Sequence, residues 1–347
     1  MQISHYLPRS LPDSLLPLAD MALDLRSTWH HGADELWRMV DSELWDATGN
    51  PWLVLETVSD QRLTELAADE RFVDALRRQI AIREEHFRAE AWFPEKYGAG
   101  FDGQIAYFSM EFGISEALPI YSGGLGVLAG DLMKTACDLD VPVIGVGLLY
   151  QQGYFRQAID AAGNQLEFYP FNDPTMLPVV PLRDDDGEWV RITVELPGRA
   201  LRLRAWRVQV GRRTLLLLDS NDLLNAPGDR GITSELYGGG AEMRLQQEIV
   251  LGIGGWRLLR RLGIDCPVCH LNEGHAAFAV LERARHFMGS SGQDFRAALR
   301  ATRAGNLFTT HTPVAAGFDR FETKLFGAYF QEYAQQLGTG LDELLGL

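Results

Sequence analysis

The chain has 347 residues, of which 46% are hydrophobic and 10% aromatic, enough apolar material for a large core divided over two or three subdomains. Its formal net charge of -15 argues against nucleic acid or an anionic membrane surface as a partner, because both require a basic patch. The sequence contains neither a signal-peptide pattern nor a run of about 18 apolar residues, so we expect a cytoplasmic protein.

The first hundred residues predict a helical region that ends in a linker. From Leu11 to about Ala91 apolar residues recur at helical spacing, and the proline and glycines from Glu90 to Gly103 indicate a linker. Large aromatic side chains usually serve as buried anchors, so core packing is favoured over a sugar-stacking surface for the tryptophans of this region. They are Trp29, Trp37, Trp45 and Trp52.

A strand, a glycine-rich turn, a helix and a second strand come next. The strands are predicted at Gln104–Met110 and Val141–Leu148, with the turn at Ser122–Gly126 and the helix from about Val127 to Leu139, which makes one βαβ unit of a parallel sheet. The uncovered amides of the turn and the positive end of the helix dipole predict a site for an anion. A tight turn without a ligand is the simpler alternative.

The same turn also fits a dinucleotide-binding pattern. Gly124 to Ala129 matches G-x-G-x-x-G/A, a weak signal by itself. A ribose hydroxyl would need an acidic residue after the second strand, whereas Leu149, Tyr150 and Gln151 stand there. This disfavours a nicotinamide cofactor.

The following segment, about residues 154–219, has the alternating pattern of antiparallel strands in EWVRITVEL, RALRLRAWRVQV and RRTLLLLD. We predict an antiparallel insertion that forms one wall of a cleft. Helix and strand patterns then alternate again, at Glu242–Leu262, Ile264–Leu271, Gly274–Met288 and Asn306–Thr310. The chain therefore divides into a helical region with its linker, residues 1–100, and an α/β domain, residues 101–347.

Two of the three cysteines form the pattern C-x-x-C-H, which attaches c-type haem. Cys266, Cys269 and His270 lie in the apolar stretch IDCPVCHL, so we interpret both cysteines as buried residues of a strand. A zinc site would need two more ligands in a matching cluster, and Cys137 lies on a predicted helix far away in the sequence. We therefore predict no metal site, and the two ends of HLNEGH need not converge on an ion either.

Four segments together resemble a known family. They are Ile105–Tyr150 with the glycine turn, ELYGGGAEMRLQQEIVLGIGG (Glu235–Gly255), HLNEGHAAF (His270–Phe278) and FTTHTPVAAGFDRF (Phe308–Phe321). In this order they are similar to the α-glucan phosphorylases that act on glycogen, starch or maltodextrin, and in particular to the bacterial branch with an extra helical N-terminal region. The resemblance implies an α/β fold with a Rossmann-like parallel sheet, the N-terminal half of a GT-B two-domain glycosyltransferase.

The resemblance also implies an activity and a cofactor. Enzymes of this family cleave the terminal bond of an α-1,4-glucan or maltodextrin with inorganic phosphate, and they use pyridoxal phosphate held by a lysine in a second Rossmann-like domain. None of the three lysines here, Lys96, Lys134 and Lys324, lies in such a segment. We interpret the chain as the N-terminal half, without the C-terminal cofactor domain and inactive alone. Assembly into a homo-oligomer is left open.

Site residues follow from the resemblance. Gly123, Gly124 and Gly126 match the loop whose amides face the phosphate and cofactor region. Leu125 matches the residue whose amide touches the sugar, and Glu111 matches a glutamate that acts in the active site through ordered water. A surface carboxylate at a strand end is the alternative for Glu111.

The later motifs add sugar contacts. Asn272, Glu273 and His275 match a Leu-Asn-Asp-x-His segment of the family, with glutamate in place of aspartate, and His311 matches the histidine that contacts the glucosyl unit. All follow predicted strands, where open α/β sheets bind ligands. Satisfied core or capping histidines are the alternative. The segment Glu235–Gly240 matches a mobile gate loop over the cleft.

Two other functions remain open at this stage. A glucan synthase that uses a sugar nucleotide has a similar two-domain architecture with a glycine loop near its N-terminus. A short, non-catalytic glucan-binding protein would also keep the sugar-side motifs and lack the lysine domain.

Overall fold

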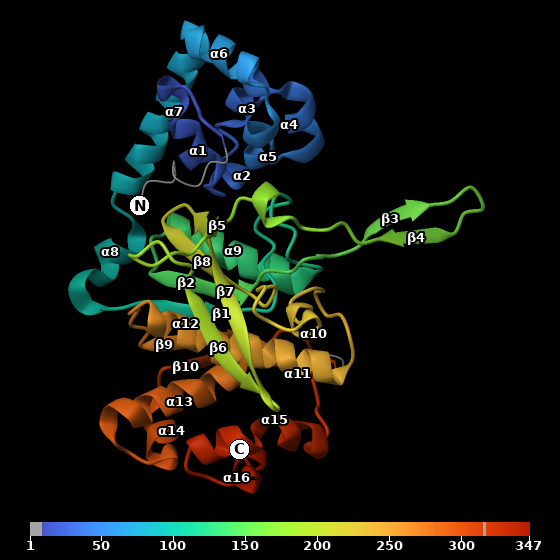
Figure 1. Cartoon of the computed structure of the whole chain (residues 1–347). Helices are drawn as coiled ribbons and strands as arrows, with labels where there is room; N and C mark the ends of the chain where they lie inside the picture. The colour runs from blue at the N-terminus through green and yellow to red at the C-terminus, as the bar shows by residue number, and fades with distance from the viewer. Residues whose placement is uncertain (1–8, 315–316) are drawn as a thin grey trace.

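The computed structural model describes residues 9–314 and 317–347. Figure 1 shows the helical N-terminal region at one end of the molecule, a mixed β-sheet in the middle and the last helices at the other end. The described residues form an α/β fold in which most strand pairs of the central sheet are parallel. The α/β fold class predicted from the sequence is therefore confirmed.

The N-terminal region is a cluster of short helices with its own core. Four successive helices, α4 to α7, each begin at a side chain that accepts a backbone amide hydrogen bond and so caps the helix. The closely spaced caps explain why the helices are mostly short. The capping residues are Asp41, Asn50, Ser59 and Asp69. Trp37, Trp45 and Trp52 are buried in this core as predicted. The elements are η2 (Asp13–Leu15), α1 (Pro17–Ala22), α2 (Ser27–His30), α3 (Asp34–Val40), α4 (Ser42–Thr48), α5 (Pro51–Thr57), α6 (Asp60–Ala68) and α7 (Glu70–Arg88).

The predicted linker contains ordered structure. A short helix, α8 (Trp92–Tyr97), and a single turn, η3 (Gly98–Gly100), occupy most of it. Trp92 and Phe93 pack their rings against Tyr97. These local aromatic contacts order the segment, although its proline and glycines indicated a linker.

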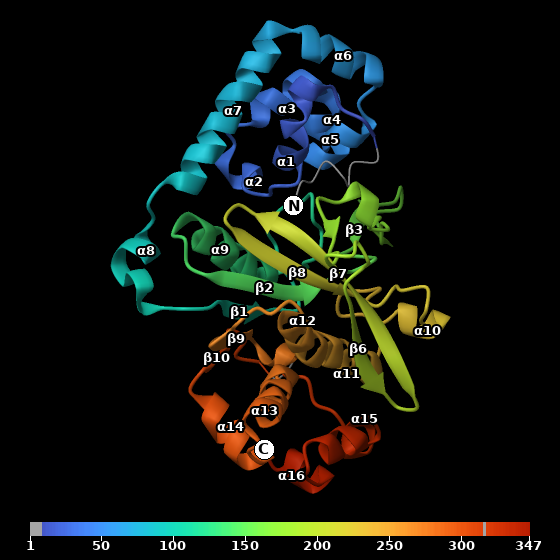
Figure 2. The same ribbon diagram turned by 60° about the vertical axis from the view of Figure 1, so that its left-hand side comes forward.

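The central sheet has eight strands. Its order is β10-β9-β1-β2-β8-β7-β5, with β6 paired to β7, and the first five of these strands are parallel. Figure 2 shows the sheet between two layers of helices. The strands are β1 (Ile105–Phe108), β2 (Val143–Leu148), β5 (Val180–Pro181), β6 (Arg191–Leu196), β7 (Arg199–Val210), β8 (Arg213–Asp219), β9 (Val268–Asn272) and β10 (Asn306–Thr309).

The antiparallel strands expected in residues 154–219 extend the same sheet. β5, β6 and β7 are antiparallel to their neighbours, whereas β8 pairs in parallel with β2 and so belongs to the α/β core. Only the hairpin of β3 (Arg156–Ile159) and β4 (Gln165–Phe168) forms a separate sheet, and it stands away from the body in Figure 1.

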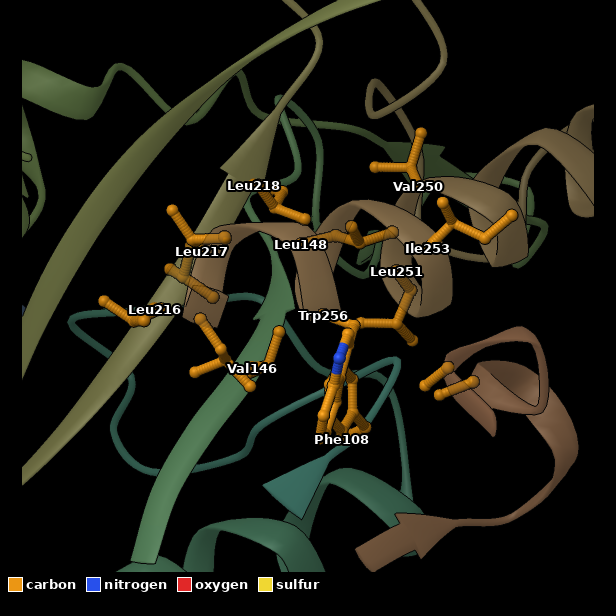
Figure 3. Close-up of a cluster of buried hydrophobic side chains, with 14 of the residues drawn as sticks. Phe108, Val146, Leu148, Leu216, Leu217, Leu218, Val250, Leu251, Ile253 and Trp256 are labelled. Carbon is orange, nitrogen blue, oxygen red and sulfur yellow. The ribbon is translucent and has the colours of Figure 1, made fainter. Parts of the chain in front are cut away.

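Helices cover both faces of the sheet. On β2, Gly145 faces Met133 of α9 (Gly124–Asp138), while the next residue, Val146, points to the opposite face. There α11 (Ala241–Ile249) and α12 (Gly255–Arg261) are joined by the π-helical turn η5 (Val250–Gly254). A Cβ atom at Gly255 would lie 2.7 Å from Phe108 and Val146, so glycine permits this close packing. Figure 3 shows the resulting apolar contact between η5, α12 and the strands.

The remaining elements complete the C-terminal end. Cys269 lies in β9 and Cys266 precedes it; both are buried, as predicted. No helix in the described ranges combines the length and the apolar character needed to span a bilayer. The elements are η4 (Pro174–Met176), α10 (Pro227–Arg230), η6 (Gly274–Ala276), α13 (Phe278–Ser291), α14 (Phe295–Arg303), α15 (Thr323–Gln336) and α16 (Leu341–Leu345).

Candidate functional site

The residues singled out in the sequence gather at one edge of the sheet. Glu111 follows β1, Asn272 ends β9, Glu273 comes directly after it, and His311 follows β10. Since β1, β9 and β10 are adjacent and parallel, their carboxyl ends meet at the same edge. This is the position at which open α/β sheets bind ligands.

The glycine turn is partly occupied by a side chain of the protein. Glu111 is buried, and its Oε2 accepts hydrogen bonds from the amides of Ser122, at 2.6 Å, and Gly123, at 3.2 Å. The first turn of α9 leaves the amides of Gly124, Leu125 and Gly126 without an acceptor inside the helix. The turn therefore binds a carboxylate of the protein itself, and the Gly123 amide serves Glu111 instead of an external anion.

Gly126 is required by this arrangement. A Cβ atom there would lie 2.5 Å from the Cβ of Tyr121 and 2.7 Å from Oε2 of Glu111. A Cβ atom at Gly124 would meet no heavy atom within 4 Å. The two glycines thus have different roles: one allows the carboxylate to approach, and the other keeps the amides open.

The segment Glu235–Gly240 contacts the same carboxylate through Tyr237. Tyr237 has a φ of 57° and donates its hydroxyl hydrogen to Oε1 of Glu111 at 2.6 Å. Burial, with the Glu111 carboxylate beside it, raises the pKa of Tyr237, which stays a neutral donor. The guanidinium of Arg244 lies 4.9 Å from the centre of the Tyr237 ring. In this conformation Glu111 joins the segment Glu235–Gly240 to the glycine turn, because it accepts hydrogen bonds from both.

A chain of hydrogen bonds fixes His311. Ser109 donates its hydroxyl to the carbonyl oxygen of Glu111, and Asn272 donates its amide to Ser109 Oγ at 3.1 Å. The remaining oxygen of Asn272 lies 3.1 Å from Nε2 of His311. An amide oxygen can only accept, so Nε2 carries the hydrogen and Nδ1 is left as an acceptor.

Glu273 supports the loop after β10 from a strained backbone position. Its φ of 61° is unusual for a residue with a side chain, and such strain is common at functional sites. Oε1 accepts the amide hydrogens of His311 and Thr312, whereas Oε2 has no partner in the described part of the chain. Burial alone would raise the pKa of Glu273, but these hydrogen bonds outweigh it and hold the pKa below its ordinary value.

A pocket of about 370 Å³ opens at this edge. Two of its side chains, Glu273 and His275, are less than a tenth exposed and each keeps a polar atom, Oε2 and Nδ1 respectively, without a partner among the described residues. Arg244 Nη1 is unpaired as well. Unpaired buried polar atoms are costly, so their concentration here indicates a polar ligand. The lining residues are Leu125, Tyr237, Arg244, Glu273, His275, Thr312, Gly317 and Asp319.

Charged groups on α11 and the last loop balance one another at the pocket. Arg244 forms an ion pair of 2.5 Å with Asp319. Burial and a hydrogen bond with Asp319 raise the pKa of Glu248 to about 9, so its carboxyl group is protonated at neutral pH. Burial, with Arg244 nearby, lowers the pKa of His275 to about 4, and its imidazole is neutral. The pocket therefore combines a neutral imidazole with the Arg244–Asp319 ion pair and the Glu273 carboxylate, and its unpaired atoms are suited to hydroxyls.

Sequence reasoning missed four of these residues: Tyr237, Arg244, Glu248 and Asp319. Arg244 and Glu248 are four apart on one face of α11, a spacing that could have marked two interacting polar side chains. Asp319 lies inside the quoted segment Phe308–Phe321, of which residues 315 and 316 fall outside the described ranges. For Tyr237 no local signal existed, because its partner is 126 residues away.

The residues of the pocket do not fit a covalently held pyridoxal phosphate. None of the three lysines lines it: Lys134 pairs with Asp131 on α9, and Lys96 lies over the ring of Trp92. A Schiff base needs a lysine amine in the site. The free amides of Gly124, Leu125 and Gly126 fit a phosphate group, but the described residues supply no anchor for the ring.

The chain is similar to one family model and to several curated proteins. A family described as a protein of unknown function (DUF3417) matches residues 11–118. The chain is 43% identical to the maltodextrin phosphorylase of Thermococcus litoralis over 92% of its own length and 38% of the relative. It is 44% identical to the glycogen phosphorylase of Mycobacterium tuberculosis, with 96% and 40% covered, and 33% identical to that of Aquifex aeolicus, with 95% and 47% covered. The chain thus spans less than half the length of these relatives.

Proposed function

Since this chain belongs to the α-glucan phosphorylase family, whose N-terminal portion it matches, we propose that it forms the glucan-binding half of an enzyme that transfers glucosyl units from glycogen or maltodextrin to phosphate. The two-domain GT-B architecture is part of this proposal. So are the pyridoxal phosphate of the complete enzyme and the cytoplasmic location.

The observation that carries the proposal is the pocket at the carboxyl ends of the strands. Glu273 Oε2 accepts and Arg244 Nη1 donates, so the unpaired atoms include both kinds of partner that sugar hydroxyls need. The imidazole of His275 is neutral, which suits an uncharged ligand. A single glucosyl unit fits a pocket of about 370 Å³.

Within this pocket the residues bind and orient rather than perform acid–base chemistry. Glu111 is engaged by two amides and by Tyr237, and Glu273 holds the loop that carries His311. We therefore assign neither carboxylate the role of nucleophile or general acid. The His311 imidazole, oriented by Asn272, lines a separate cavity against β1, β9 and α9 and not the pocket itself, and we assign it to contact with the reacting sugar at this edge. The free amides of α9 would face the phosphate side.

The first experiment is an assay of the complete gene product with maltodextrin and inorganic phosphate. We expect glucose 1-phosphate. Release of a nucleoside diphosphate from a sugar nucleotide, with no glucose 1-phosphate, would replace the phosphorylase proposal by a glucan synthase.

The second experiment uses the 347-residue chain alone. It is mixed with pyridoxal phosphate, reduced with borohydride and mapped for labelled lysine, and then assayed for phosphorolysis. We expect neither a stoichiometric adduct nor turnover, because the anchor is missing. One adduct at a single lysine together with turnover would contradict the proposal that this half lacks the cofactor site. Weak oligosaccharide binding by this chain, with no adduct and no turnover, is expected both from our proposal and from a non-catalytic glucan-binding protein. The first experiment, the assay of the complete gene product, distinguishes these two functions.

A further inference from the structure

A cluster of metal-ligating side chains lies far from the pocket, where the helical region meets the α/β domain. In Figure 2, α2 and the end of α7 lie next to α9. The side chains come from three helices that are distant in sequence. They are His30 at the end of α2, His86 in the last turn of α7, and Cys137 and Asp138 at the end of α9. We call this group the imidazole–thiol cluster.

The distances within the cluster match those between ligands of one ion. Nε2 of His86 lies 3.6 Å from Sγ of Cys137, and a carboxylate oxygen of Asp138 lies within 4.8 Å of both. Zinc–nitrogen and zinc–sulfur bonds of about 2.0 and 2.3 Å at a tetrahedral angle place the two ligand atoms about 3.5 Å apart. The atoms are therefore already spaced for a shared ion.

His30 lies beside these three side chains. Its Nε2 lies 3.4 Å from Oδ1 of Asp138, and its ring centre is 6.3 Å from that of His86. Both His30 and Asp138 are 43% exposed, so the cluster is open to solvent on this side. An ion can enter there, and the His30 ring has room to turn toward it.

The surroundings favour a cation bound to sulfur. The long helices α7 and α9 both point their carboxyl ends at the cluster, and that end of a helix dipole attracts positive charge. On the buried side, the amide of Arg212 donates to Sγ of Cys137 at 3.4 Å. Gly211, with a φ of 55°, lies against the same sulfur, where a side chain would collide with it.

Two guanidinium groups nearby, those of Arg26 and Arg212, work in the opposite direction, and the charge of Arg212 is balanced by an ion pair. Arg212 pairs with Asp140 at 3.4 Å and also donates to the carbonyl oxygen of Ala89. A bound ion would displace the thiol proton of Cys137 to solvent, giving two anionic ligands for two positive charges.

We infer that the imidazole–thiol cluster binds one divalent ion of the zinc type and thereby ties α2 and α7 to α9. Thiolate and imidazole ligands select zinc or a similar borderline metal over magnesium and calcium, which prefer oxygen. The sequence analysis predicted no metal site because the ligands of the cluster are distant in sequence. The contact between His86 and Cys137 joins residues 51 apart, and the contact between His30 and Asp138 joins residues 108 apart. This inference does not depend on the proposed function.

The test uses the whole 347-residue chain after removal of metal with a chelator. Zn²⁺ is titrated against a chromophoric competitor, and Co²⁺ is added in parallel for absorption spectroscopy. We expect one equivalent bound, a thiolate-to-cobalt charge-transfer band, and a melting temperature that rises with zinc concentration. Cys137→Ser should abolish the charge-transfer band, while Cys266→Ser, a change at another buried cysteine, should leave it.

Matched variants at the exposed ligands guard against misfolding. His30→Gln and Asp138→Asn should each weaken zinc binding by more than about tenfold, since even the outer partners of metal ligands have effects of that size. His31→Gln, beside His30, and Asp131→Asn, on the same helix as Asp138, should bind as the wild type does. Absence of a tight equivalent in the wild type, or equal binding by the ligand variants and their controls, would overturn the inference.

Discussion

Two buried polar clusters flank the central sheet, and they differ in one respect. The cluster after β8 contains Asp219, Ser220, Asn225 and Thr233, all less than a tenth exposed and all without an unpaired buried side-chain atom among the described residues. In and beside the pocket, Glu248, Glu273 and His275 are buried and Arg244 is half-buried, and each keeps an unpaired atom among the described residues. In the first cluster these four side chains are satisfied by the protein, although Nε of Arg204, the partner of Asp219, is unpaired; in the second, all four side chains keep an unpaired atom.

The difference teaches that burial of polar residues does not by itself identify a site. Asp219 accepts from Arg204 at 2.5 Å, from Trp206 at 3.1 Å and from the amide of Asn221 at 2.7 Å, so its role is to join strands to a loop. Unmet hydrogen-bonding capacity is what marks the pocket. Changes in the two clusters should accordingly affect different measurements.

The largest effect on stability should come from Asp219→Ala. The change leaves the Arg204 guanidinium and the Trp206 indole without their acceptor, and breaking a buried pair in this way costs about 3–5 kcal/mol. Denaturant unfolding measures it, with Asp219→Asn as the milder control that keeps an acceptor oxygen. A loss below about 1 kcal/mol, the size of an exposed pair, would show that this cluster is not a structural one.

A smaller loss should separate two glycines of the turn. Gly126→Ala forces a Cβ atom against Tyr121 and Glu111, and overpacking of this kind costs about 1–3 kcal/mol. Gly124→Ala meets open space and should change stability by less than about 1 kcal/mol. Thermal melts of the two variants give the comparison. Equal losses would mean that the approach of Glu111 to the turn does not depend on Gly126.

The smallest effect concerns the pH dependence of stability. The pKa of Glu248 is raised from 4.5 to about 9, so its contribution is present while the group is protonated and is lost as the pH rises. From about pH 8 to 9 the wild type should lose at most about 1.4 kcal/mol of stability relative to Glu248→Gln. His275 titrates near pH 4 and does not interfere. Parallel pH profiles of the two proteins would contradict the raised pKa.

Local signals explain what the sequence could predict. The strand β1 (Ile105–Phe108) and the helix that begins at Gly124 were located within a few residues, because an apolar run followed by bare glycines is a short-range pattern. The placement of Glu111 and Asn272 at strand ends followed from the same pattern. The parallel pairing of β8 with β2 did not, since the run RTLLLLD has the same composition in either direction.

Contacts between distant residues explain the rest. The hydrogen bond from Tyr237 to Glu111 joins residues 126 apart, and the one from the His311 amide to Glu273 joins residues 38 apart. The glycine turn was predicted at the right place. The hydrogen bond from the Gly123 amide to Glu111 was not predicted, and it removes that amide from binding an external anion. Such side-chain partners depend on the packing of the whole sheet edge and leave no periodic signal.

The central claim, that the unpaired atoms of the pocket await a sugar, is tested most directly by Glu273→Gln in the complete gene product. The glutamine oxygen can still accept from the amides of His311 and Thr312, while its NH₂ group replaces the unpaired Oε2 that faces the ligand. We predict that kcat/KM for maltodextrin phosphorolysis falls about 10- to 100-fold, the cost of one hydrogen bond to a charged group, with little change in melting temperature. Glu65→Gln on exposed α6 serves as the control. Unchanged kcat/KM in a folded Glu273→Gln protein would contradict the claim.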